Sequence, residues 1–173
     1  MTFETLRLSR IQSEALDLAP LLSSTEREDC GAMALFAGTV RNHHEGRAVT
    51  HLIYTAHAPL CEKIIAEIER ETIERFKVPE CRVVHRIGKL GIGEVAIYAI
   101  VRSPHRAEAF AALRHAVDAT KHRAPIWKEE FYPDGSSSFV QGCCIAEGHE
   151  PPEHLKRLAE SQPAHLHSHE GQH

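Results

Sequence analysis

The amino-acid sequence predicts an α+β protein in which most strands pair antiparallel. Apolar residues recur at helical spacing in two segments, 59–76 and 103–122, and the segments around them have the short apolar runs of strands. Two of those strand segments are separated only by a stretch containing Gly88, Gly91 and Gly93, which favours an antiparallel pair. The chain lacks the regular strand–helix–strand alternation of a doubly wound parallel sheet.

Length and composition limit the class of protein. The 173 residues correspond to one domain, and a hydrophobic content of 42% is enough for a packed core. Acidic residues outnumber basic ones, 24 against 20, and the net charge of −4 argues against a general nucleic-acid-binding protein. No apolar run reaches the length of a membrane span, and no apolar leader is present. We therefore expect a cytoplasmic protein with neither a nucleic-acid nor a membrane partner.

The first third of the chain is predicted to form two strands and a helix. Residues 3–9 alternate well enough for a strand, and Ser13 can cap a short helix that ends at residue 21 or 22. A polar loop follows at 24–30. The apolar segment 31–40 is predicted to be a buried strand.

The middle of the chain continues with a loop, a strand and a helix. Residues 41–48 are polar, with a turn at Glu45-Gly46, and a strand is expected at 51–56. A helix should begin near Pro59 and end near Phe76. Its predicted buried stripe consists of Leu60, Ile64, Ile65, Ile68 and Phe76.

Beyond the glycine-separated strands, at 81–87 and 94–103, a second helix is predicted. Ser103-Pro104 is a favourable start, with the serine as the cap, and the helix should end at residue 121 or 122. Its expected buried stripe is Phe110, Leu113 and Val117. The last elements are a strand at 126–132, a turn at 133–138 and a partner strand at 138–145.

The composition changes from Glu147 onward to Pro, His, Glu and Gln, with few large apolar residues. This pattern indicates a domain over 1–146 and a flexible, His-rich tail over 147–173. The tail segment HLHSH and the pair His43-His44 could bind nickel, copper or zinc. Because such segments bind metal adventitiously more often than functionally, we expect no metal site.

The five cysteines are odd in number and show no CxxC spacing, which argues against a disulfide framework or a zinc site. The adjacent Cys143-Cys144 are either a redox-active pair or two small buried residues. The second interpretation is favoured.

Basic side chains stand at the predicted ends of several elements. They are Arg41, His105, Arg106, Lys121 and Lys128. Positive charge at a helix start opposes the helix dipole, and a local conflict of this kind is typical of a functional site. Arginine and lysine near a helix start suit a phosphate. The alternative, ordinary solvated surface charges, remains open on spacing alone. The sequence has no P-loop, GxSxG, HExxH or GxGxxG motif.

Four motifs follow one another along the chain: GAMALFAGTVR at 31–41, SPHRAEAF at 103–110, ATKHRAPIWK at 119–128 and DGSSSFVQG at 134–142. Together they resemble the large (catalytic) subunit of molybdopterin synthase, and the likeness covers about residues 3–142.

The resemblance implies an α/β hammerhead fold with an additional antiparallel β subdomain. It implies an enzyme that converts cyclic pyranopterin monophosphate into molybdopterin by adding the two sulfurs of a dithiolene. Sulfur would arrive as a thiocarboxylate on the C-terminal Gly-Gly of a small ubiquitin-like sulfur-carrier subunit. The implied assembly is a heterotetramer, a homodimer of this chain with one small subunit at each end. Such sulfur transfer requires no metal or other cofactor.

The same resemblance implies the site residues. Lys121 and Lys128 would be catalytic, stabilising oxyanions and moving protons. Substrate would be bound by Thr39, Val40, Arg41, His105, Arg106, Lys121, Lys128, Glu129 and Glu130. The chain departs from the family at Glu129, because a basic residue often follows the second lysine. It departs again at Phe139, because the aromatic residue after the Asp134-Gly135 turn is usually Trp. A third departure is Tyr54-Thr55-Ala56-His57, where the family often has a Glu and a Tyr.

Helix geometry adds an inference about assembly. Arg106 and Lys121 are fifteen residues apart on one predicted helix, which is about 22 Å along its axis. One small pterin cannot reach both in the same chain. We therefore predict that His105 and Arg106 enter the site from a neighbouring subunit. The alternative function is a non-catalytic docking module for a ubiquitin-like protein, and the presence of Lys121 and Lys128 favours the enzyme.

Overall fold

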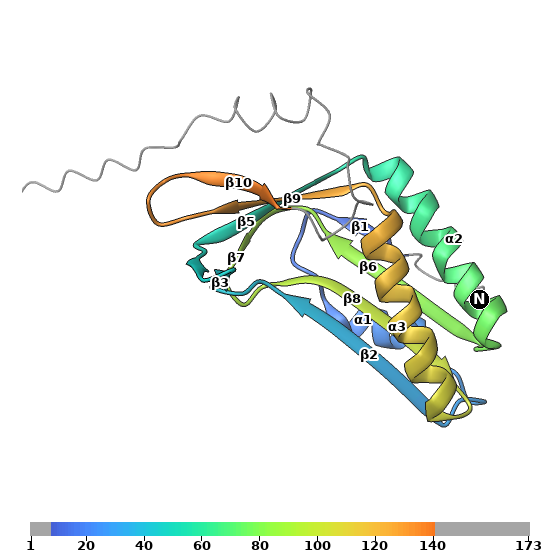
Figure 1. Cartoon of the computed structure of the whole chain (residues 1–173). Helices are drawn as coiled ribbons and strands as arrows, with labels where there is room; N and C mark the ends of the chain where they lie inside the picture. The colour runs from blue at the N-terminus through green and yellow to red at the C-terminus, as the bar shows by residue number, and fades with distance from the viewer. Residues whose placement is uncertain (1–7, 141–173) are drawn as a thin grey trace, which may run out of the picture.

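The computed structural model describes residues 8–140 and confirms the α+β prediction. In chain order the elements are β1 (Ile11–Gln12), α1 (Leu18–Ser24), β2 (Ala32–Thr39), β3 (His43–His44), β4 (Arg47–Ala48), β5 (His51–Ala56), α2 (Ala58–Phe76), β6 (Glu80–Arg86), β7 (Gly88–Gly91), β8 (Val95–Ser103), α3 (Arg106–Arg123), β9 (Ile126–Phe131) and β10 (Ser137–Val140). Figure 1 shows their arrangement.

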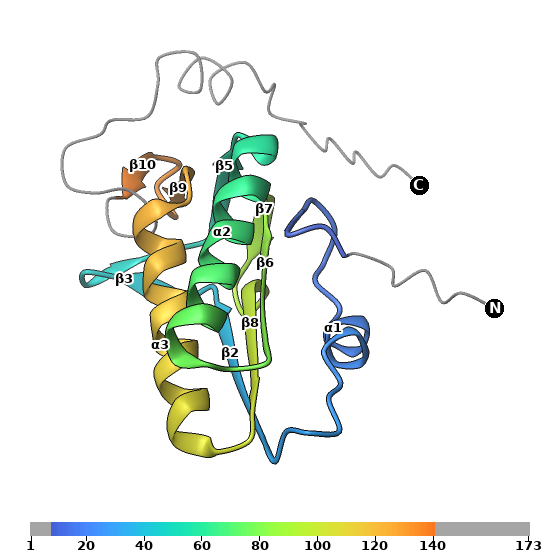
Figure 2. The same ribbon diagram turned by 90° about the vertical axis from the view of Figure 1, so that its right-hand side faces the viewer.

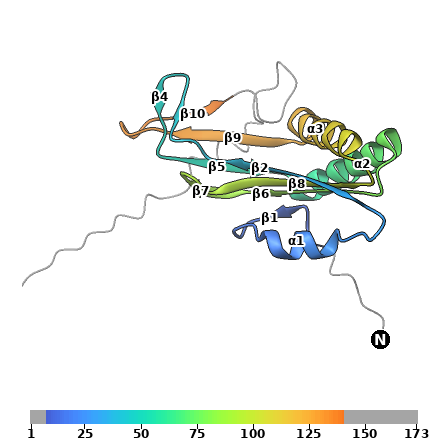
Figure 3. The same cartoon turned by 90° about the horizontal axis from the view of Figure 1, so that it is seen from below.

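The first sheet has the strand order β1-β6-β8-β2, and α2 and α3 lie side by side on one of its faces (Figure 2). The pairing is antiparallel except between β1 and β6, which are parallel. Helix α1 covers the opposite face (Figure 3), where Leu21 packs on Val84 and Ile100. The main core lies under α2 and α3. Three layers thus form around one sheet.

The second sheet, with the order β10-β9-β5-β7, is antiparallel throughout. It extends from the end of the first sheet at which α3 ends (Figure 1). An added antiparallel sheet of this kind is what the resemblance implies. Strand β7 was not predicted, because its four residues include Gly88 and Gly91 of the stretch that separates the two predicted strands. Gly88, at φ +90°, does occupy a turn conformation at the start of β7.

The segment 31–40 was predicted to be a buried strand, and this was wrong in part. It forms β2, but β2 is an edge strand that pairs only with β8, and of its residues only Ala34 is buried. Met33 and Leu35 are 45% and 37% exposed. An apolar run predicts a strand, whereas its position in the sheet is set by pairing with distant strands.

The predicted buried stripes of the two long helices are confirmed in part, at Ile65 and Ile68 in α2 and at Val117 in α3. In α2, Leu60 is exposed, and the buried side chains are Cys61, Ile65, Ile68, Glu69 and Thr72. In α3, Phe110 is 65% exposed, and the sheet is contacted mainly by small residues. These buried α3 residues are Ala109, Ala112, Ala116, Val117 and Thr120. Small side chains let α3 approach the sheet closely, so the large aromatic ring is left outside.

Several predicted boundaries are shifted. The expected strand at 3–9 lies mostly outside the described residues, and the first described strand is β1. Helix α1 begins after Asp17, whose side chain accepts a hydrogen bond from the backbone N–H of Ala19, instead of after Ser13. Helix α3 begins after His105, which makes no side-chain cap, and it ends at Arg123. Ser103 remains within β8.

The polar segment predicted as a loop at 41–48 contains the hairpin β3–β4. Its turn is at Glu45-Gly46, as predicted, and both residues have positive φ, 49° and 78°. Such a turn matches the twist of paired strands. The strands at 51–56 and 126–131 and the antiparallel pairing of β6 with β8 are confirmed.

A buried carboxylate fastens α2 to the sheet. Glu69 is 4% exposed and binds the guanidinium of Arg10 at 2.7 Å and that of Arg82 at 3.4 Å. Its other oxygen accepts the backbone N–H of Val83 at 2.9 Å. A buried charge needs such compensation. Glu69 therefore joins α2 to β6 and to the residue that precedes β1.

The His-rich tail, Cys143-Cys144 and the end of the predicted last strand lie outside the described residues. Within residues 8–140, no helix has the length and apolarity needed to cross a bilayer, and no group of three or more metal-ligating side chains gathers.

Candidate active site

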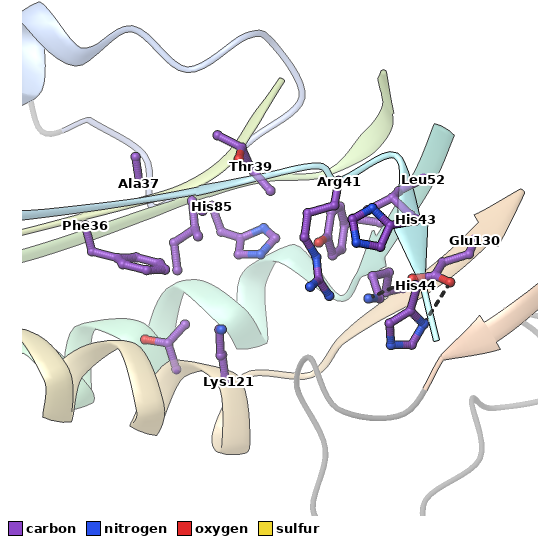
Figure 4. Close-up of a pocket in the computed structure, with 16 residues that line it drawn as sticks. Phe36, Ala37, Thr39, Arg41, His43, His44, Leu52, His85, Lys121 and Glu130 are labelled. Atoms are coloured by element: carbon purple, nitrogen blue, oxygen red, sulfur yellow. Dashed lines mark hydrogen bonds and ion pairs between the residues drawn. The ribbon is translucent and has the colours of Figure 1, made fainter. Parts of the chain in front are cut away.

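A pocket of about 360 Å³ lies where the two sheets meet, beside the C-terminal end of α3. Its volume falls in the range of small-molecule sites. Figure 4 shows the side chains that face it. The lining residues are Phe36, Ala37, Gly38, Thr39, Arg41, His43, His44, Leu52, Tyr54, His85, Ala96, Ile97, Thr120, Lys121, Lys128 and Glu130.

The fold brings five of the predicted site residues together in this pocket. Thr39 is the last residue of β2 and Arg41 follows two residues later, Lys121 comes from the last turn of α3, and Lys128 and Glu130 come from β9. They are far apart in the sequence. The end of β2, the end of α3 and strand β9 converge at the junction of the two sheets.

The other four predicted residues do not line the pocket. Val40 is 4% exposed, and its backbone N–H and carbonyl bond to Glu94 and Gly93, so its side chain belongs to the core. Glu129 points to the other face of β9, because side chains alternate along a strand. It accepts a hydrogen bond from Ser137 Oγ at 2.6 Å.

His105 and Arg106 are the remaining two, and they stand at the start of α3. That start lies at the far end of the molecule from the second sheet (Figure 1). The helix is continuous from Arg106 to Arg123, as the sequence predicted. Within a single chain, these two residues and Lys121 therefore lie at opposite ends of α3.

Gly38 shapes the wall from which Arg41 projects. A Cβ on Gly38 would stand 2.6 Å from Cγ2 of Ile97, which is 5% exposed and cannot move aside. The pairing with β8 shifts register between Gly38 and Thr39. This irregularity turns the end of β2 toward the second sheet and places Arg41 at the pocket.

Lys128 forms an ion pair with Glu130, two residues further along β9. Its Nζ lies 3.0 Å from Glu130 Oε1, and the glutamate side chain is only 3% exposed. The other oxygen, Oε2, is 3.1 Å from Nδ1 of His44 and 3.4 Å from the hydroxyl of Tyr132. The carboxylate is thus satisfied at both oxygens, and Lys128 has a fixed position.

Arg41 and Lys121 contribute positive charge that the described residues do not neutralise. Neither side chain is within ion-pair distance of an acid in residues 8–140, and Lys121 Nζ lies 5.8 Å above the ring of Phe36. Three cations and one carboxylate therefore face the cavity. Such an excess of positive charge suits an anionic ligand, and arginine gives phosphate a two-point contact.

His85 is a buried neutral imidazole in the pocket wall. Its ring stands edge-on to Tyr54 at 5.0 Å, and Nδ1 donates to the carbonyl of Arg86 at 2.7 Å. Burial, with a smaller contribution from the charge of Lys121, lowers the pKa of His85 to about 4. With the proton fixed on Nδ1, Nε2 is left as a hydrogen-bond acceptor.

The three described cysteines lie away from the pocket. Burial raises the pKa of Cys61 to about 11 and raises that of Cys81 further, and it also raises the pKa of Cys30. All three are therefore thiols at neutral pH. Residues 8–140 thus supply no reactive thiolate to this cavity.

Three further residues, His44, His85 and Tyr54, line the pocket although the sequence did not mark them as site residues. His44 was seen only as part of a histidine pair with metal-binding capacity. His85 and Tyr54 lie on alternating apolar strands, where the period-2 pattern indicates only burial. A polar residue at an inward position, as His85 is in β6, was the available signal.

Comparison with known proteins gives the family. A family model described as "MoaE protein" matches residues 11–123. The molybdopterin synthase catalytic subunit of Nostoc sp. is 37% identical over 150 residues, which cover 86% of this chain and 85% of that protein.

Solved structures agree with the match. The crystal structure of molybdopterin synthase from Staphylococcus aureus superimposes with a TM-score of 0.72 at 34% identity, covering 76% of this chain and 95% of the other. A complex of subunits 1 and 2 of the molybdopterin-converting factor from Helicobacter pylori shares the fold, with a TM-score of 0.63 at 21% identity and coverage of 79% and 92%. The chain therefore belongs to the MoaE family and is a catalytic subunit of the molybdopterin synthase type.

Proposed function

We propose that this pocket binds cyclic pyranopterin monophosphate and that sulfur is transferred to it from the thiocarboxylated C-terminus of a separate small subunit. The observation that carries the proposal is the convergence of Arg41, Lys121 and Lys128, from three separate segments of the chain, on one cavity of about 360 Å³. A cyclic phosphate supplies the anion that these cations require. The positions of the described cysteines support an external sulfur source.

Each basic residue then has a distinct task. Arg41 binds the phosphate and orients the substrate. Lys121 and Lys128 stabilise the oxyanions that develop during transfer, move protons and hold the partner's terminal carboxyl group. Each transfer leaves the partner's terminus as a carboxylate, whose new oxygen comes from water, and leaves the sulfur on the substrate. None of these roles of Arg41, Lys121 and Lys128 calls for a metal.

The structure of α3 and β2 supports a site shared between two copies of the chain. Ala32, at the start of β2, pairs with Ser103, next to His105 and Arg106, whereas Thr39 at the other end lines the pocket. The eight-residue strand spans about 23 Å between these ends, which agrees with the length of α3 between Arg106 and Lys121.

Exposed apolar side chains favour a second copy at this edge. Met33 and Leu35 on the edge strand and Phe110 near the start of α3 are 45%, 37% and 65% exposed. Apolar edge strands left open in solution promote association. We infer a symmetric homodimer in which His105 and Arg106 of each chain complete the partner's pocket. The Helicobacter pylori complex shows that a protein of this fold assembles with a second, different subunit.

A reconstituted assay tests the proposed function. Wild type and Lys121→Ala are incubated with cyclic pyranopterin monophosphate and a thiocarboxylated small subunit, and molybdopterin is measured. We expect product from wild type and a loss of at least about 100-fold in the variant, the size of a positioned acid–base or oxyanion group. Arg114→Ala, which removes a residue of α3 that is 86% exposed, is the matched control and should retain full activity. No product from wild type, despite tight binding of the small subunit, would overturn the proposal.

A further inference from the structure

The short hairpin β3–β4 is fastened at two points, to β9 and to the turn that joins β9 to β10. On the pocket side, His44 Nδ1 lies 3.1 Å from Glu130 Oε2. On the outer side, the guanidinium of Arg47 binds Asp134 Oδ2 at 3.1 Å and Ser136 Oγ at 2.7 Å, and it lies 3.4 Å above the ring of Tyr132. The hairpin is thus held by one contact inside the site and by one set of contacts outside it.

Glu130 is the link between the hairpin and Lys128. One of its oxygens binds Lys128 Nζ at 3.0 Å, and the other binds the histidine. The carboxylate is almost fully buried, so each oxygen needs a donor. The hydroxyl of Tyr132 is farther from Oε2, at 3.4 Å, and it lies closer to Ser138 Oγ, at 2.6 Å. His44 is therefore the closer of the two donors on Oε2.

Removing the His44 donor would change what Lys128 can do. Without His44, Oε2 of Glu130 would keep only the long contact with the Tyr132 hydroxyl at 3.4 Å. A buried carboxylate with one weakly bound oxygen attracts the nearest ammonium more strongly, because little water is present to replace the lost contact. Lys128 would then be drawn onto both oxygens and away from the cavity. With His44 in place, a single oxygen binds the ammonium, and the other protons of Lys128 remain available to reacting groups.

We propose that His44 is a positioning residue, which acts through Glu130 to hold Lys128 at the reacting centre. The inference rests on the proposed function, since it assumes that Lys128 takes part in sulfur transfer. His44 also lies three residues after Arg41, so the same contact joins the segment that binds phosphate to the strand that carries the lysine. Figure 4 shows Arg41, His44 and Glu130 together at one end of the pocket.

Two variants of equal shape isolate the hydrogen bond. In His44→Asn the side-chain amide nitrogen stands near the position of Nδ1 and retains a donor, whereas His44→Leu has the same outline without one. We expect His44→Leu to lower kcat about tenfold, in the range of a lost hydrogen bond to a charged group. KM for the pterin should change by less than about twofold. His44→Asn should keep kcat within about threefold of wild type.

Arg47→Gln is the control for general loosening of the hairpin, since Arg47 fastens it from the outer side. It should leave kcat unchanged. An equal loss in Arg47→Gln and His44→Leu would overturn the proposal in favour of a purely structural effect. Because His44 acts through Glu130, His44→Leu should also cause no further loss when it is added to Glu130→Gln. Additive losses in that pair would contradict the mechanism.

Lys128→Ala in the same assay separates this inference from the proposed function. If Lys128→Ala keeps the wild-type kcat, the role proposed for the lysine is wrong, and the positioning role of His44 falls with it. If Lys128→Ala is inactive while His44→Leu matches wild type, only the role of His44 is overturned.

Discussion

At the scale of single residues, the pocket contains both fixed charges and a fixed neutral group. Lys128 is held by Glu130, whereas His85 is kept uncharged by burial and, to a smaller extent, by the nearby positive charge of Lys121. The neutral ring leaves the excess of positive charge to Arg41 and the two lysines. It also makes His85 a source of pH-dependent stability.

We expect His85→Asn to remove part of the acid sensitivity of folding. The pKa of His85 is lowered from 6.5 to about 4 in the folded protein, so the unfolded chain binds one more proton between these values. The stability from this group is complete above pH 6.5 and is lost as the pH falls toward 4. The loss amounts to about 1.4 kcal/mol per pH unit and about 3 kcal/mol in all.

Urea unfolding of wild type and His85→Asn at pH 7, 6, 5 and 4 measures this difference. Other titrating groups are common to both proteins and cancel in the comparison. Equal slopes of unfolding free energy against pH in the two proteins would contradict the neutral state of His85.

At the scale of elements, each helix is attached to the sheet in its own way. Helix α3 brings small residues against the strands, and α2 adds the buried carboxylate of Glu69. The period of the apolar residues predicted both helices. It did not predict the burial of Glu69, because a glutamate in an amphipathic helix is ordinarily a surface residue. The partners of Glu69, Arg10 and Arg82, also lie outside the helix.

Glu69→Ala should lower the free energy of unfolding by about 3 kcal/mol. The change leaves two guanidinium groups without their carboxylate and the N–H of Val83 without an acceptor. Glu71→Ala is the control on the same helix, because its partner Arg123 is on the surface and such pairs contribute less than about 1 kcal/mol. Both are measured by urea unfolding at pH 7. Losses of equal size would show that the Glu69 contacts carry no special stability.

At the scale of the whole molecule, the proposed site requires two copies of the chain. Arg106→Ala and Lys121→Ala homodimers should each be inactive. When equal amounts are mixed and allowed to exchange subunits, half of the dimers are mixed, and one of their two sites is intact. About a quarter of wild-type activity should therefore return. Mixed dimers that form but recover no activity would disprove a shared site.

The sequence by itself determined the local structure and the chemistry available to it. Apolar periodicity predicted α2, α3, β5 and β9 because side-chain spacing follows directly from backbone geometry. The positions of Arg41, Lys121 and Lys128 at the predicted ends of elements marked them as candidates for an anion site. Motifs in a specific order then identified the family and implied the roles of these residues.

Only the tertiary structure decided what depends on distant segments. It made β2 an edge strand, exposed Phe110, turned Glu129 out of the pocket and brought His44 and His85 into it. Each of these outcomes is set by contacts between residues far apart in the chain. Local spacing carries no information about such contacts, because the same strand or helix pattern can pack in several positions.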